Sequence, residues 1–535
     1  MKLTSTLSMA VLACALAASG ATPIDDSACV WKWSALGCQP KALCSYQLQA
    51  GDLTPSQSCR VKPGVNKLPQ QVHLAFAGTT TGTGMAVSWA TFASVVDSAV
   101  WIGTSASNLA LAPVTVSIKS YYSEGDYSLF QNHATLLGLT PNTKYFYKVG
   151  SASDATLQSD VSSFTTARSA NDATSFDVLV YGDAGDGDNS AATIEYVNTL
   201  ASKVDFVYHI GDISYADDDY LTPSQALGFF YEEVYNKWMN MMTPLMSQVA
   251  YMVSVGNHEA ECHSPNCQLS SYKKDHLGNY TAYNSRFKMP SQESGGVLNM
   301  WHSFEHGPLH ITTISSETDY PGAPTNQYTL SNKNGNFGNQ LAWLEADLKK
   351  AAANRANVPW LIVAMHRPIY SIKDADASGS PTGQPKIIQA AFEELFIKYG
   401  FTSSTKNGNF GNQLAWLEAD LQKAAANRAS VPWLIVGMHH PIYTIEEADK
   451  RNFPIARGAA VMAGVSADNR TYANPKAPVY MITGAAGTVE NHTTKPTNTV
   501  PWNAASDNEN WGVSMLSVTR KSLEFKFIAS ADQQF

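Results

Sequence analysis

The sequence predicts a multidomain α+β protein in which an N-terminal β-sandwich is followed by an α/β sandwich domain. At 535 residues the chain is too long to fold around one compact core, so two or three domains are expected. Short apolar runs separated by Gly, Ser and Asn fill residues 68–168, a pattern typical of a β-sandwich. Residues 175–535 instead alternate strand-like runs with helical stretches, which indicates an α/β layer architecture.

The first 21 residues have the pattern of a secretory signal peptide. Lys2 precedes an apolar stretch from Leu7 to Ala18, and small residues follow up to Ala21. This apolar stretch is too short to cross a bilayer, and no later stretch reaches that length. We therefore expect cleavage near Ala21, secretion to the extracellular space, and a mature protein that does not interact with membranes.

Cysteine usage agrees with export. Residues 22–67 form a cysteine-bearing segment, and six cysteines remain once the signal peptide is removed: Cys29, Cys38, Cys44, Cys59, Cys262 and Cys267. An even number in an oxidising compartment predicts three disulfides. Cys262 and Cys267 are close enough in sequence to close one loop. The other four would pair within the N-terminal segment, with zinc binding as the alternative, although their spacing fits no common zinc site.

The net charge and the glycosylation sequons indicate which kinds of binding partner and which cell compartment to expect. The formal net charge of −9 and pI near 5.8 argue against a nucleic-acid-binding surface. An anionic substrate would therefore need local positive charge, which bound metal ions can supply. Glycosylation sequons at Asn279, Asn469 and Asn491 are typical of a secreted glycoprotein. The sequence does not define an oligomeric state.

The two domains differ in the elements that they contain. In the first, the predicted strands are Val72–Phe76, Met85–Trp89, Ala99–Ile102 and Tyr145–Val149. The run from Leu139 to Val149 resembles the end of a fibronectin type III-like module. In the second, Gln340–Ala353 has Leu341, Leu344, Leu348 and Ala352 on one helical face, which predicts an amphipathic helix packed on a sheet.

Four segments of the second domain run from an apolar strand into polar residues. They are Phe176–Gly185, Val204–Tyr215, Tyr251–Glu259 and Trp360–His366. Any one of them has an ordinary structural interpretation, such as a turn or a capped strand end. In open α/β sheets, however, ligands gather at the carboxyl ends of strands. Because all four segments end in this way, we expect their polar side chains to converge in one cleft.

The polar residues suit a pair of metal ions. The carboxylate of Asp212 can bridge two ions, and Asp183 and Tyr215 offer hard anionic oxygen to a trivalent ion. Asn257 and His366 suit a divalent neighbour. Two adjacent metal ions generate hydroxide near neutral pH and clamp the attacking and leaving oxygens during displacement at phosphorus. A phosphate ester is therefore the expected substrate.

The same segments resemble the purple acid phosphatases of the metallophosphoesterase superfamily. Four of the five blocks of the family pattern are found, as Gly182–Gly185, Gly211–Tyr215, Gly256–Glu259 and Val363–His366. The resemblance covers roughly residues 68–535 and implies an acid phosphatase that acts on phosphate monoesters. The tyrosine in the second block distinguishes this family from other metallophosphoesterases.

The resemblance also implies a role for each residue. Asp183 and Tyr215 would hold Fe³⁺, and Asp212 would bridge the two ions. Asn257 and His366 would hold a divalent ion, which is zinc, manganese or iron in the family. His258 would contact phosphate and protonate the leaving group. We interpret the histidines without motif support as structural: His73, His133, His263, His276, His302, His306, His310 and His492.

The fifth block of the family, Gly-His-x-His, does not occur in this sequence. Where it is expected, the chain enters a near copy of itself: residues 331–376 recur as 404–449, with 38 of 46 positions identical. A recent duplication, or an erroneous joining of gene segments, would produce such a pair. Because one position in a fold accommodates one copy, we expect the other copy to lie elsewhere, to extend a sheet edge, or to pack poorly.

The second copy, residues 404–449, also contains a candidate metal ligand. His439 is the counterpart of His366 and is an alternative ligand, whereas the adjacent His440 would point to the opposite face of a strand. Without the fifth block, each ion is expected to lack one ligand, so activity is expected to be impaired. The alternative function is a catalytically inactive protein, derived from the family, that binds or scaffolds.

Overall fold

The computed structural model describes residues 32–34, 37–39 and most of residues 67–530. Outside it lie residues 125–126, 222–228, 325–333, 401–433, 439–448, 489–499 and a few single or paired positions between 372 and 508. The predicted signal peptide, His439, Asn469 and Asn491 therefore lie outside the described residues, as do the side chains of the N-terminal cysteines. The short strands β1 (Lys32–Ser34) and β2 (Gly37–Gln39) pair with each other.

The first domain is a sandwich of two antiparallel sheets. One sheet has the order β12 (Ser162–Thr165), β11 (Lys144–Ser151), β5 (Ser98–Ser105) and β6 (Asn108–Leu111). The other has the order β3 (Gln70–Ala77), β4 (Gly84–Thr91), β10 (Phe130–Leu137) and β7 (Ser117–Lys119). The predicted β-sandwich is confirmed.

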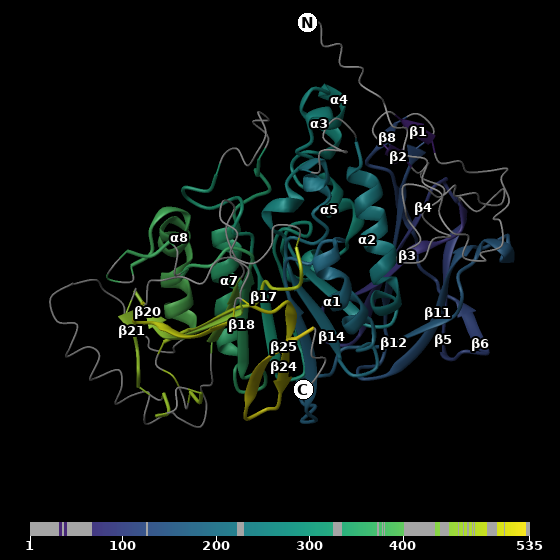
Figure 1. Ribbon diagram of the computed structural model, residues 1–535. Coiled ribbons are helices and arrows are strands. Elements are labelled where there is room, and N and C mark those ends of the chain that lie inside the picture. The colour runs from purple at the N-terminus through teal and green to yellow at the C-terminus, as the bar shows by residue number, and fades with distance from the viewer. Residues whose placement is uncertain are drawn as a thin grey trace, which may run out of the picture.

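The second of these sheets continues into the next domain without a break. Strand β3 pairs with β15 (Ala250–Ser254), which lies beside β14 (Phe206–Ile210) and β13 (Phe176–Tyr181), all parallel. Antiparallel β24 (Gly512–Val518) and β25 (Leu523–Ala529) complete a nine-stranded sheet. Helices α1 (Asp188–Asn198) and α2 (Tyr231–Met246) pack on it (Figure 1).

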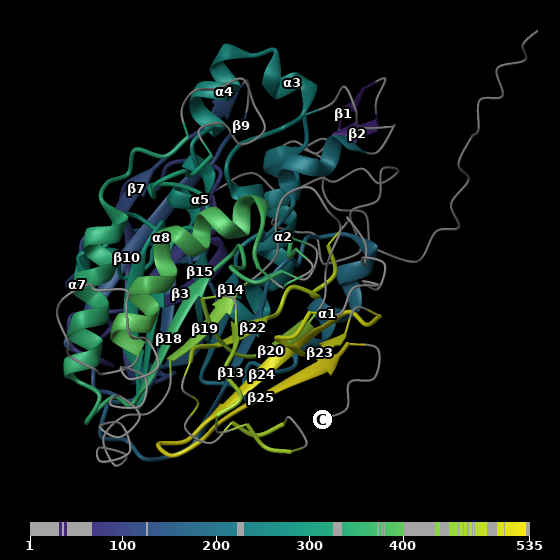
Figure 2. The ribbon, with the colours of Figure 1, turned by 90° about the vertical axis from the view of Figure 1, so that its left-hand side faces the viewer.

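A second sheet of eight strands faces the first. Its order is β16 (His302–His306), β17 (Leu309–Thr313), β18 (Trp360–Met365), β19 (Leu434–Met438), β22 (Val479–Ile482), β20 (Asp449–Ala456) and β21 (Ala459–Ala460), and β23 (Asn503–Asp507) pairs with β20. Buried apolar residues of both sheets, such as Val178, Phe206 and Ile362, form one core between them. Helices α7 (Gln340–Ala353) and α8 (Gly383–Gly400) lie against this second sheet (Figure 2). The predicted α/β sandwich is therefore confirmed.

The two copies of the repeated segment contribute neighbouring strands to this sheet. Strand β18 comes from the first copy and β19 from the second, and they pair in parallel with Leu361 opposite Leu434 and Met365 opposite Met438. Each residue thus lies opposite its own counterpart. Because β19 also pairs with β22, it occupies an interior position and not the sheet edge that was one of the expected locations.

Short elements fill the connection after β15 and the outer loops. They are β8 (Ser123–Glu124), β9 (Tyr127–Ser128), α3 (Pro265–Gln268), α4 (Ser271–Leu277), α5 (Thr281–Arg286), α6 (Ser291–Ser294) and the 3₁₀ turns η3 (Ala155–Leu157), η4 (Ala216–Leu221) and η5 (Asn257–Glu259). None of the helices in the described part of the chain combines the length and apolar character that crossing a membrane requires.

Candidate metal centre

Four strand ends deliver polar side chains to one buried place between the two sheets. Asp183 follows β13, Asp212 follows β14, Asn257 follows β15, and His366 follows β18 of the facing sheet. One ligand atom from each of Asp183, Asp212 and His366 lies within 4.8 Å of the others. All four side chains are buried. The sequence pattern therefore leads to a compact cluster of oxygen and nitrogen donors.

The backbone around the cluster adopts an unusual conformation. Asp183, Asp212 and Tyr215 have φ angles of 57°, 50° and 52°, in the left-handed region that L-residues rarely enter. The turns are nevertheless held by backbone hydrogen bonds, from Asp183 N to Gly211 O at 3.3 Å and from Gly185 N to Ile213 O at 3.1 Å. Strain of this kind persists where the surrounding structure fixes it, and it is concentrated at functional sites.

Two glycines permit the close approach of the loops. A Cβ atom on Gly211 would lie 2.8 Å from Nδ1 of His366, and one on Gly256 would lie 2.2 Å from Oδ1 of Asp212. Both distances are too short for any side chain. Glycine at these positions thus allows the loops after β14 and β15 to bring Asp212 and His366 together.

The orientation of His366 leaves one ring nitrogen for the cluster. Its Nδ1 lies 3.0 Å from the carbonyl oxygen of Ile210 and donates to it. Its Nε2 lies 3.1 Å from Oδ2 of Asp212 and 3.0 Å from Oδ1 of Asn257. A backbone carbonyl that fixes Nδ1–H is a common arrangement for a histidine that binds metal through Nε2.

Electrostatics show that the cluster attracts positive charge. Burial raises the pKa of the Asp212 carboxyl, but the charges of His366 and His258 outweigh burial and hold it well below its usual range. Conversely, burial lowers the pKa of His366, but Asp212 outweighs burial and raises it. The carboxylates thus favour a proton or a cation at the same place, so the donor set fits hard and borderline metal ions.

Glu259 ties the two loops of the cluster together. Its carboxylate accepts hydrogen bonds from the backbone N–H groups of Asp212 at 2.9 Å, Ile213 at 2.8 Å and Gly256 at 2.8 Å. Burial, reinforced by the charge of Asp212, raises the pKa of Glu259 to about 7. Glu259 lies within the third sequence block, Gly256–Glu259, but its sequence context alone does not indicate this role.

Tyr215 and His258 lie beside the cluster. The hydroxyl of Tyr215 is 3.5 Å from Oδ2 of Asp212, and its ring centroid is 4.1 Å from that of His258. The backbone N–H of His258 donates to Oδ1 of Asp212 at 2.9 Å, and its Nε2 lies 3.7 Å from Oδ2. All the described residues that the sequence singles out for this centre are therefore close together, whereas His439 lies outside the described residues.

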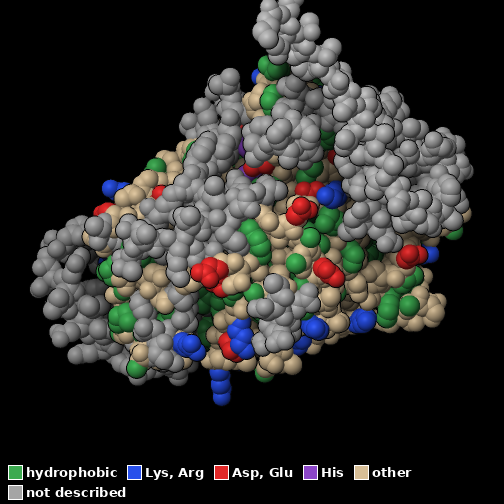
Figure 3. Space-filling view, viewed as in Figure 1, with side chains coloured by type: hydrophobic (Ala, Val, Ile, Leu, Met, Phe, Trp, Pro, Cys, Tyr) green, Lys and Arg blue, Asp and Glu red, His purple; other side chains and the backbone are tan. Residues whose placement is uncertain are grey.

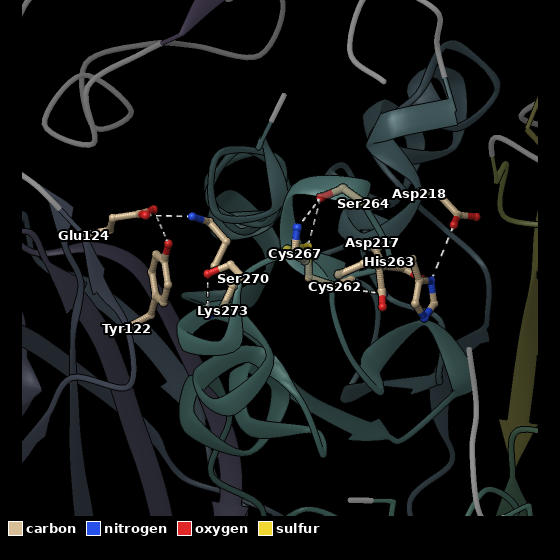
Figure 4. The surroundings of a disulfide bond; sticks show 11 residues. Tyr122, Glu124, Asp217, Asp218, Cys262, His263, Ser264, Cys267, Ser270 and Lys273 are labelled. Carbon is tan, nitrogen blue, oxygen red and sulfur yellow. Dashed lines mark hydrogen bonds and ion pairs between the residues drawn. A yellow bond between two sulfur atoms is a disulfide. The ribbon is translucent and has the colours of Figure 1, made fainter. Parts of the chain in front are cut away.

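A second group of titratable residues lies next to His258, and sequence reasoning missed it. Asp217, Asp218 and His263 each offer a ligand atom within 4.8 Å of the others. Figure 4 shows His263 beside the disulfide between Cys262 and Cys267, with interactions to both aspartates. Two signals were available in the sequence, because Asp217 follows the tyrosine block by two residues and His263 directly follows Cys262.

The disulfide between Cys262 and Cys267 agrees with the sequence expectation. The one sequon asparagine within the described residues, Asn279, has a partly buried side chain. Its amide exchanges hydrogen bonds with the backbone of Gly335, at 3.2 Å and 2.8 Å. Glycosylation of Asn279, Asn469 and Asn491 stays a prediction.

Family models match most of the chain. The purple acid phosphatase N-terminal domain matches residues 69–166, the calcineurin-like phosphoesterase domain matches residues 176–400, and the iron/zinc purple acid phosphatase-like C-terminal domain matches residues 477–535. The whole second copy, residues 404–449, falls between the last two matches.

Individual relatives agree with these models. The chain is 30% identical to purple acid phosphatase 23 of Arabidopsis thaliana over 62% of this chain and 71% of the relative. It is 29% identical to acid phosphatase A of Cryphonectria parasitica, with 79% and 81% covered, and 26% identical to human acid phosphatase type 7, with 84% and 85% covered. The fold is similar to that of a purple acid phosphatase from yellow lupin seeds, with a TM-score of 0.62, 18% identity, and 89% of this chain and 74% of that chain covered. Motifs, fold and relatives agree, and the chain belongs to the purple acid phosphatase family.

Proposed function

We propose that this protein is a secreted acid phosphatase that hydrolyses phosphate monoesters at a dinuclear metal centre. The observation that carries the proposal is the convergence of Asp183, Asp212 and His366 at the ends of strands from two facing sheets. The curated relatives named above are acid phosphatases and purple acid phosphatases. The chain is acidic, with a net charge of −9, and basic side chains stand apart from one another on the described part of the face in Figure 3. Bound cations are thus the natural source of positive charge for a phosphate.

The ligands divide by chemistry into two sets. Asp183 and Tyr215 would hold Fe³⁺, because carboxylate and phenolate oxygens suit a hard trivalent ion. Asn257 and His366, whose ligand atoms lie 3.0 Å apart, would hold a divalent ion of zinc, manganese or iron. The carboxylate of Asp212 would bind both ions. Bound there, two cations would neutralise the phosphate and activate water for attack.

His258 would contact the phosphate and act as the proton donor. Its Nε2 faces the cluster, at 3.7 Å from Oδ2 of Asp212. In the reaction, the attacking water would lose a proton to solvent, and the resulting hydroxide oxygen would join phosphorus as the bond from phosphorus to the alcohol oxygen breaks. The electron pair of that bond stays on the departing oxygen, which takes a proton from Nε2 of His258.

Because the Gly-His-x-His block is missing, the proposed metal centre has fewer protein ligands than the family pattern provides. His439 is a candidate substitute, because it follows β19 as His366 follows β18, and these strands pair in register up to Met365 and Met438. Removal of the imidazole in a His439→Ala variant would then lower the bound metal per chain. An unchanged metal content would exclude His439 as a ligand.

Turnover by the metal-loaded protein tests the proposal. Purified protein reconstituted with iron and zinc should hydrolyse p-nitrophenyl phosphate at acid pH and show a visible charge-transfer band from tyrosinate bound to Fe³⁺. Absence of turnover from protein that carries two metal ions per chain would overturn the proposed activity. N-terminal sequencing of the secreted protein tests cleavage near Ala21.

The absent fifth block favours a second candidate function, a catalytically inactive member of the family that binds or scaffolds. This candidate predicts low metal content and no charge-transfer band even after reconstitution. Stoichiometric binding of two metal ions would count against it, so metal analysis separates the two candidates before any activity is measured.

A further inference from the structure

A fifth strand end brings polar residues next to the metal centre. The loop after β17 contains Ser315, Ser316, Glu317 and Thr318, and each of these residues is at most 1% exposed. Strand β17 is the parallel neighbour of β18, so the loop lies beside His366 at the carboxyl ends of the same sheet. The loop therefore places a buried carboxylate close to a candidate metal ligand.

Uncharged groups hold this loop in place. The side chain of Gln340, at the start of α7, accepts a hydrogen bond from Ser315 N at 2.5 Å and donates to Ser315 O at 3.0 Å and Thr318 O at 3.1 Å. The hydroxyl oxygen of Ser316 accepts from the backbone N–H of Arg367 at 2.7 Å. These bonds involve amide and hydroxyl groups only, so they do not depend on the charges of the loop.

The charges beside His366 form a buried ion pair. Arg367 directly follows His366, and its side chain is 2% exposed, while that of Glu317 is 0% exposed. Nε of Arg367 donates to Oε2 of Glu317 at 2.7 Å. A guanidinium removed from water is strongly unfavourable unless a carboxylate compensates its charge. The pair is neutral as a whole, but it brings two full charges to the end of β18.

Both charges act on His366. Asp212 favours a positive charge on the imidazole most strongly, Glu317 favours it as well, and Arg367 disfavours it. A divalent cation at Nε2 of His366 would be subject to the same signs, and buried charges are only weakly screened. Without the carboxylate of Glu317, the charge of Arg367 would therefore repel that cation.

We propose that Glu317 cancels the charge of Arg367 and thereby preserves the affinity of the His366 side of the centre for a divalent cation. This inference rests on the proposed function, in which His366 and Asn257 hold the divalent ion. Glu317 acts through Arg367 and is not itself a ligand. Groups that surround the ligands of a metal site commonly change its affinity by about 10- to 100-fold when they are replaced.

Titration with Zn²⁺ tests the inference without any measurement of turnover. Full-length protein depleted of metal is titrated by calorimetry near neutral pH, and the binding event that His366→Ala removes identifies the site. Glu317→Gln loses the charge but keeps an oxygen for the hydroxyl of Ser316, which lies 3.1 Å from Oε1. We expect the Kd for Zn²⁺ at this site to rise by about 10- to 100-fold. An unchanged Kd would overturn the inference.

A double variant separates charge from shape. Glu317→Gln combined with Arg367→Met removes both charges, and the hydrogen bond from the backbone of residue 367 to Ser316 can still form. We expect the Kd for Zn²⁺ to return to within about threefold of wild type. A rise as large as that of Glu317→Gln would show that the contact matters for shape and would overturn the inference. If Glu317→Gln alone fails to fold, the Kd of the double variant decides in the same way.

Glu232→Gln provides a matched control. Oε2 of Glu232 lies 3.0 Å from Nη2 of Arg286, and these side chains are 1% and 0% exposed, but the pair joins α2 and α5 and lies outside the group of candidate ligands. This variant should lose stability without a change in the Kd for Zn²⁺, and an equal rise in Kd would overturn the inference. Wild-type protein that binds no Zn²⁺ through His366 would overturn the proposed metal centre itself, whereas normal binding by both wild type and Glu317→Gln overturns only this inference.

Discussion

Asp212 is the residue on which the metal centre depends most. Its two carboxylate oxygens contact different groups, with Oδ1 accepting from the backbone of His258 at 2.9 Å and Oδ2 lying 3.1 Å from His366. Asp212→Ala removes the only side chain proposed to bridge the two ions. We expect loss of at least one metal ion per chain and of all measurable turnover, as read by elemental analysis and phosphate release. An Asp212→Ala variant that keeps both would contradict the dinuclear assignment.

Gly256 tests how closely the loops must approach. Its φ angle is −116°, which any residue adopts, so an added methyl group acts only through contact. That methyl carbon would lie 2.2 Å from Oδ1 of Asp212 and would displace it. Because a misplacement near 1 Å costs about 100-fold in rate, we expect Gly256→Ala to lower kcat by roughly that factor.

Gly138→Ala is the control for this prediction. Gly138 has a φ of 74° and no atom within 4 Å of an added Cβ, so its substitution adds strain in the first domain without touching the centre. Its activity should be unchanged. A Gly256→Ala variant as active as Gly138→Ala would show that the loops can move apart freely.

At the residue scale, the sequence motifs predicted the residues at the strand ends, but they did not predict contacts between residues that lie far apart in the sequence. Asp183, Asp212, Asn257 and His366 each end a strand, so their convergence followed from topology. His263 was interpreted as structural because nothing in its local sequence links it to Asp217, 46 positions earlier. Only the path of the loop after η5 brings these two side chains within 2.6 Å.

At the scale of elements, helix α7 shows both the strength and the limit of periodicity. The structure has this helix at Gln340–Ala353, as the sequence predicts, with Leu344 and Leu348 buried. The pattern of apolar residues gave no hint that Asp347 is buried as well. Its carboxylate accepts hydrogen bonds from Ser303 at 2.6 Å and Thr312 at 2.7 Å and pairs with His310, so a polar contact joins α7 to strands β16 and β17.

This contact predicts a dependence of stability on pH. Burial lowers the pKa of His310, but Asp347 outweighs burial and raises it from 6.5 to about 9. A raised pKa stabilises the fold fully below pH 6.5, and that stability is lost as the pH rises through about 9. Asp347 has a lowered pKa despite burial, so its contribution is present above its ordinary value of 3.8 and is lost as the pH falls below it.

Asp347→Asn should therefore destabilise most between these limits. We expect a loss of about 3 kcal/mol near pH 6, typical of breaking a buried ion pair, and a smaller loss near pH 10, both measured by chemical denaturation. Glu345→Gln on the same helix is the control, because the Glu345–Lys398 pair is exposed and should contribute less than about 1 kcal/mol. A loss for Asp347→Asn that does not change with pH would contradict the assigned pair.

At the scale of the whole molecule, the order of strands could not be read from the sequence. The two predicted domains share one nine-stranded sheet, because β3 of the sandwich pairs with β15 at Leu74 and Ala250. Pairing between strands more than 170 positions apart leaves no local signal. The fold class follows from periodicity and alternation, whereas this continuity, and the interior place of β19, depend on which sheet edges are available to pair.

Proline substitution tests the interior place of β19. Val436 pairs with Val363 of β18 on one side and Tyr480 of β22 on the other. Because proline removes a ladder hydrogen bond in the middle of a sheet and leaves the partner carbonyl unsatisfied, Val436→Pro should destabilise by about 1–3 kcal/mol. Val363→Pro, the same change in the first copy, should cost a similar amount. A Val436→Pro protein with the melting temperature of wild type would show that the second copy is not part of the sheet.

The register of β18 and β19 has a further consequence for how the protein is made. Strands β18 and β19 differ at only one of their five paired positions, Ala364 against Gly437. Each strand can therefore take the position of the other in the sheet during folding. On the ribosome the first copy is synthesised before the second. Strand β18 can therefore pair with β17 before the competing strand β19 exists. A denatured chain offers both copies at once, so refolding in vitro partitions between correct and exchanged products. Recovery of native protein from denaturant should fall well below the yield from secretion.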